Sequence, residues 1–580
     1  MKRYCYFILL SVIVFQLNSQ VVKSELRERV YLQTDKNLYL SGEPIHIKLL
    51  TTDQDLVPVV FSKVAYVELL ADSAAHLQIK IGLTNGTGSG RMILPTDLPA
   101  GYYRLMAYTQ FMRNEGVDVF FEKMIAVVNT FQSGYYLESP PVPPKGGETP
   151  LRVFTEDRPP SPWGNAGVGL DKTTYSRRDR GELIISGLPE NIHTLSVSIA
   201  GKDLLNDVEP ESSLFQNYKR KQSTKFSGDF LPEYEGHIVM GNFVENQPEN
   251  LTAFESEVES DADAPSVKIT ALSFPTVEGI RFFSGQESET GHIRFVTSGV
   301  GGTKEIATVV FQADEKYRVD ILSPFVTRYA PKKMPDLHLD SAYYSQLLAR
   351  SVALQVLRYF SKDQAEKQTV SKPHFDMKPA WSYPLDEYTR FTSMREVFIE
   401  FITGARFRRR DGKQELSVMT QTGSNSTYGT MVLALIDGVP ITDHDIIYNY
   451  DPLAVERINI YYGPCSLGGY RFDGVVELIT YRRLHADINL PKSTQIFTYE
   501  GPQLPYRLDT PDYSDNSRQI WTPDSRHTLL WNPDVKTNGE TSISLPFYTS
   551  DLRGEFQATV EGITTDGKMF FAKSFFKVEI

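Results

Sequence analysis

Alternating apolar and polar residues, the pattern of a half-buried β-strand, recur along most of the chain. The alternation is plain at residues 45–49, Ile-His-Ile-Lys-Leu, and again at residues 195–199, Leu-Ser-Val-Ser-Ile. In the N-terminal region, turn signals such as Asn85-Gly86 and Pro99-Ala100-Gly101 separate the runs. Short strands between closely spaced turns are typical of a β-sandwich. We therefore predict one sandwich over residues 25–133.

The same pattern returns after a proline-rich stretch. Residues 139–150 read SPPVPPKGGETP, which indicates a semi-rigid linker that we assign to residues 134–160. Beyond it, Asp171-Lys172-Thr173-Thr174-Tyr175 repeats Asp35-Lys36-Asn37-Leu38-Tyr39, 136 positions earlier. One repeat of this kind indicates a duplicated module. We therefore predict a second sandwich over residues 161–230.

Two further β domains are predicted from the same signals. The first covers residues 231–328 and is Ig-like, and the second covers residues 485–580 at the C-terminal end. In the latter, Asn538-Gly539 and Asp566-Gly567 lie between strand-like runs and supply the positive φ that tight hairpins require.

Helical periodicity is limited to two stretches before residue 404. Leucines recur at helical intervals behind Asp340, a possible cap, so a helix is predicted over residues 340–360, within a helical connector of residues 329–375. Ser393 and Glu396 have the spacing of a capping box and predict a shorter helix that ends at Gly404.

Residues 376–484 predict a small mixed α/β domain. A β run over residues 431–436 stops at Asp437-Gly438, and a second alternating run ends at Gly463-Pro464. Residues 475–480 form a last apolar strand. Strand runs interrupted by such breakers indicate a compact unit of this kind. The fold class is thus mainly β and multi-domain, with several Ig-like sandwiches and one small α/β domain.

Composition and charge exclude some functions. The 580 residues favour about four domains, and 41% hydrophobic with 23% charged residues is ordinary for a globular protein. The 31 tyrosines and 33 phenylalanines suit strands better than helices. A net charge of −12 argues against nucleic acid as a partner, since that requires concentrated basic surface.

The first 24 residues have the pattern of a secretory signal peptide. Lys2 and Arg3 precede the apolar residues 7–17, and Val22-Lys23-Ser24 suits cleavage. Cys5 lies before the apolar core, so a lipoprotein anchor is not expected. We expect no transmembrane helix. After cleavage Cys465 is the one cysteine left, which precludes an internal disulfide.

The search for reactive or metal-binding residues gives few candidates. HExxH and CxxC spacings are missing from the sequence, and His444 with Asp443, Asp445 and Asp451 comes nearest to a metal site. We interpret these four as solvated loop residues. Residues 255–263 alternate acidic with small residues, which indicates a solvated loop or, alternatively, a calcium site. We predict no cofactor, no metal and no enzymatic activity.

Several stretches resemble the macroglobulin-type domains of α2-macroglobulin-like proteins. They are residues 31–36 (Tyr-Leu-Gln-Thr-Asp-Lys), Gly42-Glu43-Pro44 and Leu98-Pro99-Ala100-Gly101-Tyr102-Tyr103, with Leu530-Trp531-Asn532-Pro533 near the C-terminal end. The resemblance implies macroglobulin-like sandwiches over residues 25–133, 161–230 and 485–580. The internal thioester of those protease traps needs a GCGEQ-type motif, but Cys465 is followed by Ser-Leu-Gly.

A second resemblance is to the plug domain of TonB-dependent outer-membrane receptors. Four motifs carry it, at residues 435–440 (Leu-Ile-Asp-Gly-Val-Pro), 455–458 (Val-Glu-Arg-Ile), 463–466 (Gly-Pro-Cys-Ser) and 474–480 (Gly-Val-Val-Glu-Leu-Ile-Thr). In that family the plug sits inside a barrel of about 22 strands, which takes roughly 200 residues of strand. The chain after Tyr481 is too short for this, so the resemblance implies a plug-like domain without its barrel.

Resemblance to both families in one chain implies an envelope protein of bacteria of the Bacteroides type. We predict a non-enzymatic binding or scaffold protein, in the periplasm or associated with the outer membrane, that docks to an outer-membrane barrel protein or another envelope protein. The candidate contact residues are Asp437, Gly438, Asp443, His444, Asp445, Gly463, Pro464 and Cys465, with Arg406, Arg408 and Arg410 as a second surface.

Three alternatives remain open. The arginines alternate along one side of a strand and can simply guard an edge against stray pairing. The whole chain can be a macroglobulin-like defence protein that captures proteases without a thioester. Cys465 can be the nucleophile of a thiol hydrolase, which would require nearby groups that lower its pKa.

Overall fold

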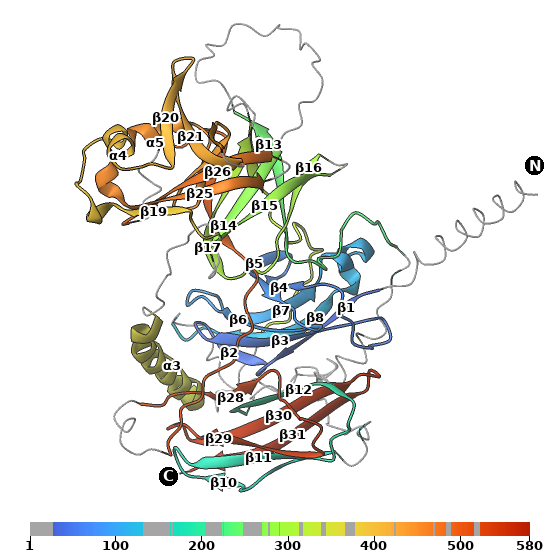
Figure 1. Ribbon diagram of the computed structural model, residues 1–580. Helices are drawn as coiled ribbons and strands as arrows, with labels where there is room; N and C mark the ends of the chain where they lie inside the picture. The colour runs from blue at the N-terminus through green and yellow to red at the C-terminus, as the bar shows by residue number, and fades with distance from the viewer. Residues whose placement is uncertain are drawn as a thin grey trace, which may run out of the picture. The chain divides into compact units, whose positions relative to one another are not determined.

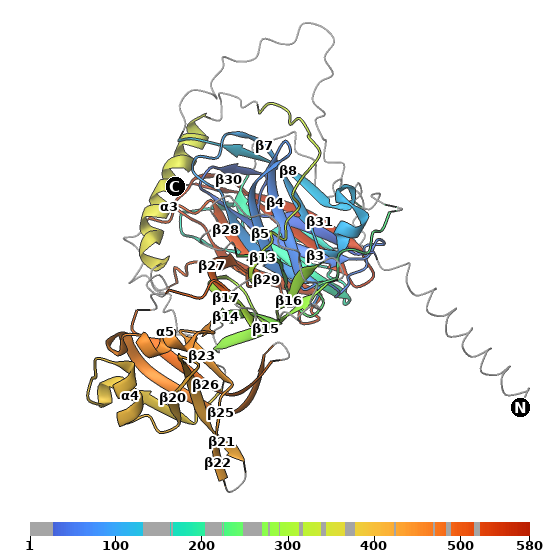
Figure 2. The ribbon, with the colours of Figure 1, turned by 90° about the horizontal axis from the view of Figure 1, so that it is seen from above.

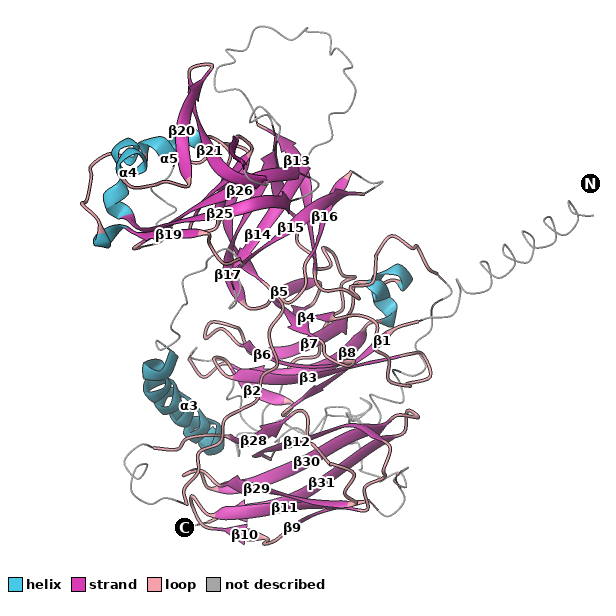
Figure 3. Cartoon of the chain, in the orientation of Figure 1, coloured by secondary structure: helices cyan, strands magenta, loops and turns pink. Residues whose placement is uncertain are grey.

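The computed structural model describes residues 27–131, 163, 166–202, 218, 223, 225–246, 269–275, 279–288, 291–311, 317–337, 344–365, 377–422, 425–467, 470–482, 489–514 and 523–579. The signal peptide of residues 1–24, the linker of residues 134–160, the acidic residues 255–263 and the helix cap Asp340 fall largely or wholly outside them. The described chain is mainly β and multi-domain, which confirms the predicted fold class (Figure 3). It forms two compact units. The first has residues Met1–Tyr234, Val326–Lys367 and Gln503–Ile580, and the second has Glu235–Phe325 and Gln368–Pro502.

The first unit begins with a β-sandwich of eight strands. One sheet has the order β1-β3-β6 and the other β2-β8-β7-β4-β5. The strands are β1 (Arg29–Thr34), β2 (Leu38–Leu40), β3 (Pro44–Thr52), β4 (Val64–Ala71), β5 (Ala74–Gly82), β6 (Thr87–Ile93), β7 (Gly101–Tyr108) and β8 (Phe121–Val128). Short 3₁₀ helices at Phe111–Glu115 and Val117–Val119 connect the last two strands.

A second sandwich in the same unit is built from two distant parts of the chain (Figure 1). Its sheets have the orders β29-β11-β9 and β10-β31-β30-β12-β28. The strands are β9 (Gly167–Leu170), β10 (Thr174–Tyr175), β11 (Arg180–Ser186), β12 (Ile192–Gly201), β28 (Thr528–Asn532), β29 (Ser542–Tyr548), β30 (Gly554–Thr564) and β31 (Met569–Val578). Residues 161–230 and 485–580, predicted as separate domains, thus share one sandwich. Backbone pairing between β12 and both β28 and β30 joins them.

The two sandwiches repeat one plan strand by strand. In each, a short second strand pairs in parallel with the last one, β2 with β8 and β10 with β31. The fourth and fifth strands are neighbours in both, β4 with β5 and β12 with β28. In the second sandwich the chain leaves after Gly201 and returns at His527, whose carbonyl accepts a hydrogen bond from the Gly201 N–H at 3.0 Å. Residues 203–526 are therefore an insertion between two neighbouring strands.

Helix α3 (Tyr344–Ala365) belongs to this insertion and packs on the first sandwich. Leu347 and Leu354 are buried against Leu38 and Leu40 of β2. Arg350, one turn along, donates through Nε (2.8 Å) and Nη2 (2.6 Å) to the Glu43 carboxylate. Among the described residues, the structure has no helix with the length and apolarity to cross a bilayer.

The second unit contains a sheet of the order β18-β13-β16-β15-β14-β17-β27. Its strands are β13 (Ile238–Glu245), β14 (Ile269–Pro275), β15 (Ile280–Glu287), β16 (His292–Val296), β17 (Thr303–Phe311), β18 (Tyr317–Ile321) and β27 (Thr494–Glu500). Strand β27 lies in the range predicted as the C-terminal domain, yet it pairs with β17 over seven residues. It therefore completes this sheet instead.

The rest of the second unit is an α/β domain, residues 377–482. Its main sheet has the order β19-β25-β26-β23-β24, with β23 and β26 parallel. The strands are β19 (Trp381–Pro384), β23 (Val432–Ile436), β24 (Val439–Ile441), β25 (Val455–Leu467) and β26 (Tyr470–Thr480). The helices are α4 (Met394–Glu400) and α5 (His444–Asn449), with 3₁₀ turns at Leu385–Glu387 and Pro452–Ala454. Ser393 caps α4, as its spacing to Glu396 predicts.

Both faces of this sheet are covered. On one face Ala434 and Ile436 of β23 pack with residues of α4 and α5. On the other, Leu433 and Leu435 pack with residues of β14 and β17 such as Val309. A strand buried on both sides reads as a continuous apolar run, which accounts for the sequence Val-Leu-Ala-Leu-Ile of β23.

Candidate functional site

A three-stranded ribbon rises from the α/β domain and carries the predicted arginine surface. It consists of β20 (Ala405–Arg410), β21 (Lys413–Thr422) and β22 (Asn425–Gly429), in that order. The β20–β21 hairpin projects beyond the domain's main sheet in Figure 1, and the β21–β22 end of the ribbon projects beyond it in Figure 2. The ribbon is therefore accessible within its own domain.

The two faces of β20 differ sharply. Phe407 faces the domain, where its ring lies 4.7 Å from that of Phe398 and 5.1 Å from that of Tyr448. Arg406, Arg408 and Arg410 are exposed and, being two residues apart, share the opposite face. The alternation in the sequence thus places these three side chains together.

Tyr428 of β22 organises this face. The Arg406 guanidinium lies 3.6 Å from the centre of the Tyr428 ring, and that of Arg408 lies 5.8 Å from it. Such stacking is attractive because the ring face is electron-rich. Among the described residues, no ion pair engages Arg406 or Arg408. We call Arg406, Arg408, Arg410 and Tyr428 the arginine face.

An aromatic patch continues beyond the ribbon. The Tyr462 hydroxyl lies 4.0 Å from the sulfur of Met419, which is the cross-strand partner of Tyr428. The Trp381 ring stands edge-on to Tyr462 at 4.3 Å. Partial burial raises the pKa of Tyr462 to about 12, so its hydroxyl stays neutral. Sequence reasoning missed these aromatic residues because they come from three separate strands.

Asp437 and Gly438, predicted as contact residues, form the turn between β23 and β24. Both have positive φ, 47° and 88°. The buried Asp437 carboxylate accepts hydrogen bonds from the Thr480 N–H at 2.8 Å and hydroxyl at 2.6 Å. A Cβ on Gly438 would lie 2.2 Å from Ile280. Both residues thus support the fold from inside the second unit.

Asp443, His444 and Asp445 begin α5. Asp443 caps the helix by accepting from the Asp445 N–H. The Asp445 carboxylate accepts from the Gln414 N–H at 2.9 Å, and His444 Nδ1 accepts from the Leu416 N–H at 3.1 Å. Strand β22 pairs with β21 only from Val418 onward. The side chains of Asp445 and His444 therefore accept the hydrogen bonds of the earlier β21 residues, Gln414 and Leu416, that a neighbouring strand would otherwise accept.

This arrangement also decides the protonation of His444. Nδ1 accepts a hydrogen bond, so the proton resides on Nε2, which lies 3.2 Å from the Val432 carbonyl. Burial lowers the pKa of His444 and keeps the ring neutral. Among the described residues, no group of three or more His, Cys, Asp or Glu side chains is placed to hold a metal ion.

Gly463, Pro464 and Cys465 lie at a bulge in β25. The pairing register with β26 shifts between Tyr462 and Cys465, and Pro464 is exposed. Cys465 is half-buried and packs beside a cluster that includes Phe311 and Phe472. Burial raises the pKa of the Cys465 thiol, and a neutral thiol is a poor nucleophile. Its environment therefore suits packing.

The repeated Asp-Lys-x-x-Tyr motif forms the same hydrogen bonds in both sandwiches. Tyr39 donates to Asp35 at 2.7 Å, as Tyr175 does to Asp171. In each copy the lysine N–H donates to the tyrosine oxygen, at 3.3 Å. The match shows that the repeat in the sequence is a repeat in structure.

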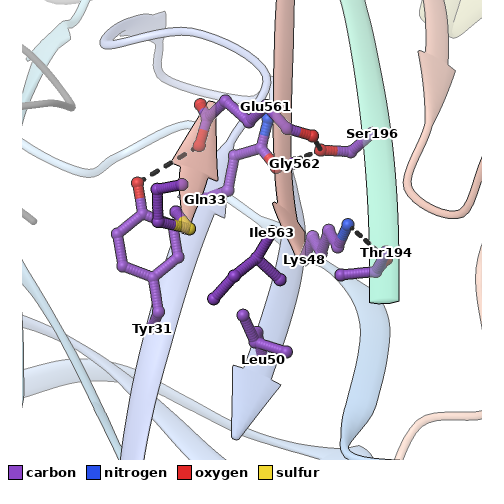
Figure 4. A pocket seen from close by; sticks show the side chains of 10 residues that line it. Tyr31, Gln33, Lys48, Leu50, Thr194, Ser196, Glu561, Gly562 and Ile563 are labelled. Carbon is purple, nitrogen blue, oxygen red and sulfur yellow. Dashed lines mark hydrogen bonds between the residues drawn. The ribbon is translucent and has the colours of Figure 1, made fainter. Parts of the chain in front are cut away.

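A small cavity lies at the contact between the two sandwiches of the first unit and is lined by residues of both (Figure 4). Lys48 Nζ donates to the Thr194 hydroxyl at 2.8 Å, Ser196 donates to Gln33 at 2.6 Å, and Tyr31 donates to Glu561 at 3.1 Å. The volume of about 20 Å³ has room for roughly one water molecule. This cavity is too small for an organic substrate or cofactor.

Comparison with known proteins gives distant structural similarity only. No family model and no curated protein matches the chain. The solved structure of Salmonella α2-macroglobulin reacted with methylamine is 9% identical, with a TM-score of 0.23, over 96% of this chain and 40% of that one.

Two other solved structures are similarly distant. Native Escherichia coli α2-macroglobulin has 9% identity and a TM-score of 0.24, over 96% of this chain and 40% of that one. The Escherichia coli adhesin FdeC has 9% identity and a TM-score of 0.13, over 50% of this chain and 60% of that one. The chain thus spans about 40% of the length of the macroglobulins that it matches. TM-scores this low establish no shared function.

Proposed function

We propose that this protein is a non-enzymatic binding or scaffold protein of the bacterial cell envelope. In this proposal it docks to an outer-membrane barrel protein, in transport or assembly, through the arginine face of its α/β domain. The observation that carries the proposal is the stacking of Arg406 on Tyr428 at 3.6 Å, on an exposed ribbon where Arg406 and Arg408 are in no ion pair among the described residues.

The chemistry of this face supports a role in protein binding. Arginine, tyrosine and tryptophan dominate the energetics of protein interfaces because they combine a large apolar area with hydrogen-bonding groups. Stacking restrains the Arg406 guanidinium before the partner arrives, which lowers the entropic cost of binding. Because the chain as a whole has a net charge of −12, a concentrated basic face selects an acidic partner surface and its orientation.

The sequence supports the cellular location. The N-terminal pattern of a signal peptide implies export. The plug-like motifs imply a relationship to proteins that work inside outer-membrane barrels. The Gly438 and Asp437 side of the plug-like domain is engaged inside the second unit, which leaves the ribbon and the Pro464 bulge as the contact surface in this proposal.

A crosslinking experiment tests the docking. Envelopes that contain the tagged chain are crosslinked, and the captured barrel protein is quantified for the chain and for Arg406→Glu with Arg408→Glu. We expect the double variant to lose most of the captured barrel. Arg409→Glu with Lys413→Glu makes the same charge change on the same ribbon while leaving Arg406 and Arg408 intact, and it should capture normally. Equal capture by both variants, or no barrel protein at all, would reject the proposal.

A second function is favoured by the duplicated sandwiches, which bear the macroglobulin-like motifs. As a protease-capturing protein without a thioester, the chain would need a cleavable bait, for which residues 139–150 or 255–265 would serve. Limited proteolysis separates the two functions. A large change in hydrodynamic radius on cleavage supports the trap, whereas a nick without such a change supports the scaffold.

A further inference from the structure

Strand β20 is an edge strand, and the hydrogen bonds of β21 show which of its backbone groups point outward. Among the described residues β20 pairs only with β21. The N–H groups of Gln414 and Leu416 on β21 donate to side chains of α5, at 2.9 and 3.1 Å, and therefore point away from β20. Their partners on β20 are Arg409 and Phe407. Because the residues of a non-hydrogen-bonded pair direct their backbone groups away from each other, Arg409 and Phe407 present theirs at the free edge.

These outward groups are unpaired within the part of the chain that the structure describes. No described residue bonds to the N–H or the C=O of Phe407 or Arg409. Phe407 is half-buried and Arg409 is exposed. An edge with free donors and acceptors of this kind can take an extended segment as an additional strand.

The side chains along this edge decide which segment fits. Arg406, Arg408 and Arg410 share one face of β20, at intervals of about 6.6 Å for every second residue. Arg406 and Arg408 are in no ion pair among the described residues, and neither is Glu415, which lies opposite Arg408 on β21. Arg410 lies 3.8 Å from Asp411 in an exposed pair, which contributes little. Such a row of positive charge rejects basic strands and deters neutral ones, but it attracts an acidic strand.

We propose that the arginine face takes an extended acidic segment of its partner, which adds to the ribbon as a strand beside β20. The backbone of this segment hydrogen-bonds to Phe407 and Arg409. Carboxylates at every second position lie opposite Arg406, Arg408 and Arg410, because directly opposed residues of paired strands have Cβ atoms about 4.5–5.5 Å apart. The inference rests on the proposed function, which makes an outer-membrane barrel protein the source of the segment.

The arrangement requires a particular spacing of acidic residues. In an extended segment alternate side chains lie on one face. Acidic residues at every second position therefore all face the arginines, whereas a continuous block of the same residues directs half of them to the other face. General attraction between opposite charges does not distinguish these two patterns.

Peptide binding to the full-length chain tests this spacing. The probe is a fluorescent peptide of about seven residues with alternating Glu and Thr and blocked ends, and its binding is measured by fluorescence anisotropy. The matched peptide has the same composition with its glutamates in one block. We expect the alternating peptide to bind about fivefold more tightly, because more of its carboxylates lie opposite an arginine.

Two variants of Arg409 test whether the backbone of the edge is used. Arg409→Pro removes the outward N–H, which an edge strand tolerates because this group bonds to no neighbour. Arg409→Gln removes the same charge but keeps the N–H. We expect Arg409→Pro to bind the alternating peptide about fivefold more weakly than Arg409→Gln does, since one hydrogen bond is lost.

A third variant tests the face. Arg408→Gln makes the same charge change as Arg409→Gln on the same strand, but on the face that carries the arginine row. It should weaken binding of the alternating peptide more than Arg409→Gln does. Backbone hydrogen exchange of β25 checks that each variant is folded. The comparison of the two peptides uses the unaltered chain and decides the matter even if Arg409→Pro does not fold.

The contrary outcomes are distinct. Equal binding of the alternating and block peptides, equal binding by Arg409→Pro and Arg409→Gln, or no peptide binding would overturn the strand addition. Peptide binding as expected, together with a failed capture of barrel protein, would leave the strand addition standing and reject the barrel as its source. Capture of a barrel protein that needs Arg406 and Arg408, without the expected peptide binding, would leave the proposed function standing and reject the strand addition.

Discussion

The two sandwiches of the first unit share one strand plan but place the same motif in opposite surroundings. In the first, Lys36 and Glu43 lie 3.4 Å apart with side chains 4% and 6% exposed. In the second, the equivalent Lys172 and Asp179 lie 3.0 Å apart but are 46% and 30% exposed. The motif therefore forms the same local structure in either environment. Packing around it decides how much it contributes to the free energy of unfolding.

The buried copy is covered by elements far away in the sequence. Thr528 of β28 donates to Asp35 at 2.8 Å, and Arg350 of α3 binds Glu43. The Arg350 guanidinium holds the pKa of the Glu43 carboxyl well below its usual range despite burial. A buried ion pair depends on both partners, since either charge alone is costly. The exposed copy has water to replace a lost partner.

The largest contrast is expected from removing the acidic residue of each copy. Glu43→Ala leaves the buried Arg350 without its carboxylate, while Lys36 keeps Asp35 at 3.3 Å, and should lower the free energy of unfolding by about 3–5 kcal/mol. Asp179→Ala removes the equivalent exposed group and should cost at most about 1 kcal/mol. Chemical denaturation of both variants measures the difference. Equal losses would show that burial does not distinguish the copies.

A pH titration sharpens the contrast at a second matched position. Lys48 of β3 is buried, and burial lowers its pKa to about 8, while the equivalent Ile184 of β11 is 40% exposed. Between about pH 8 and 10.4 the unfolded chain binds more protons than the folded one, so the free energy of unfolding should rise with pH, by up to about 3 kcal/mol.

Two variants serve as controls for this pH dependence. Lys48→Met should abolish the rise that Lys48 contributes, because it has no group to titrate. Ile184→Lys introduces a lysine at the exposed equivalent position and should add no further rise below about pH 10. Denaturation at pH 7.5 and 9.5 gives the comparison. A wild-type rise that survives in Lys48→Met would assign it to other groups.

The smallest effect is expected from the motif tyrosines. Tyr39→Phe deprives the buried Asp35 of a donor and should cost about 1–3 kcal/mol. Tyr175→Phe removes the same hydrogen bond from the exposed Asp171, where water replaces it, so the loss should be about 1 kcal/mol or less. Thermal denaturation can rank the two variants. A larger loss for Tyr175→Phe would contradict the contrast.

Several features of the fold and site were predictable because their contacts are local. The alternation at residues 45–49 is a strand, Asp437-Gly438 is a turn with positive φ, and Ser393 caps α4. The arginines at positions 406, 408 and 410 share one face because strand geometry alone requires it. Hydrogen bonds within four residues likewise make the Asp-Lys-x-x-Tyr repeat recognisable.

The sequence by itself determined the strands, the turns, the duplicated motif and the alternation of the arginines, since each depends on near neighbours along the chain. Only the tertiary structure decided that β12 and β28 join residues 161–230 and 485–580 in one sandwich. It also decided that Lys48 is buried, that Tyr428 stacks on Arg406, and which copy of the motif is covered. The physical reason is that each of these features depends on which surfaces come into contact in the folded chain. A strand with one polar face has the same sequence pattern whether that face contacts water or another domain.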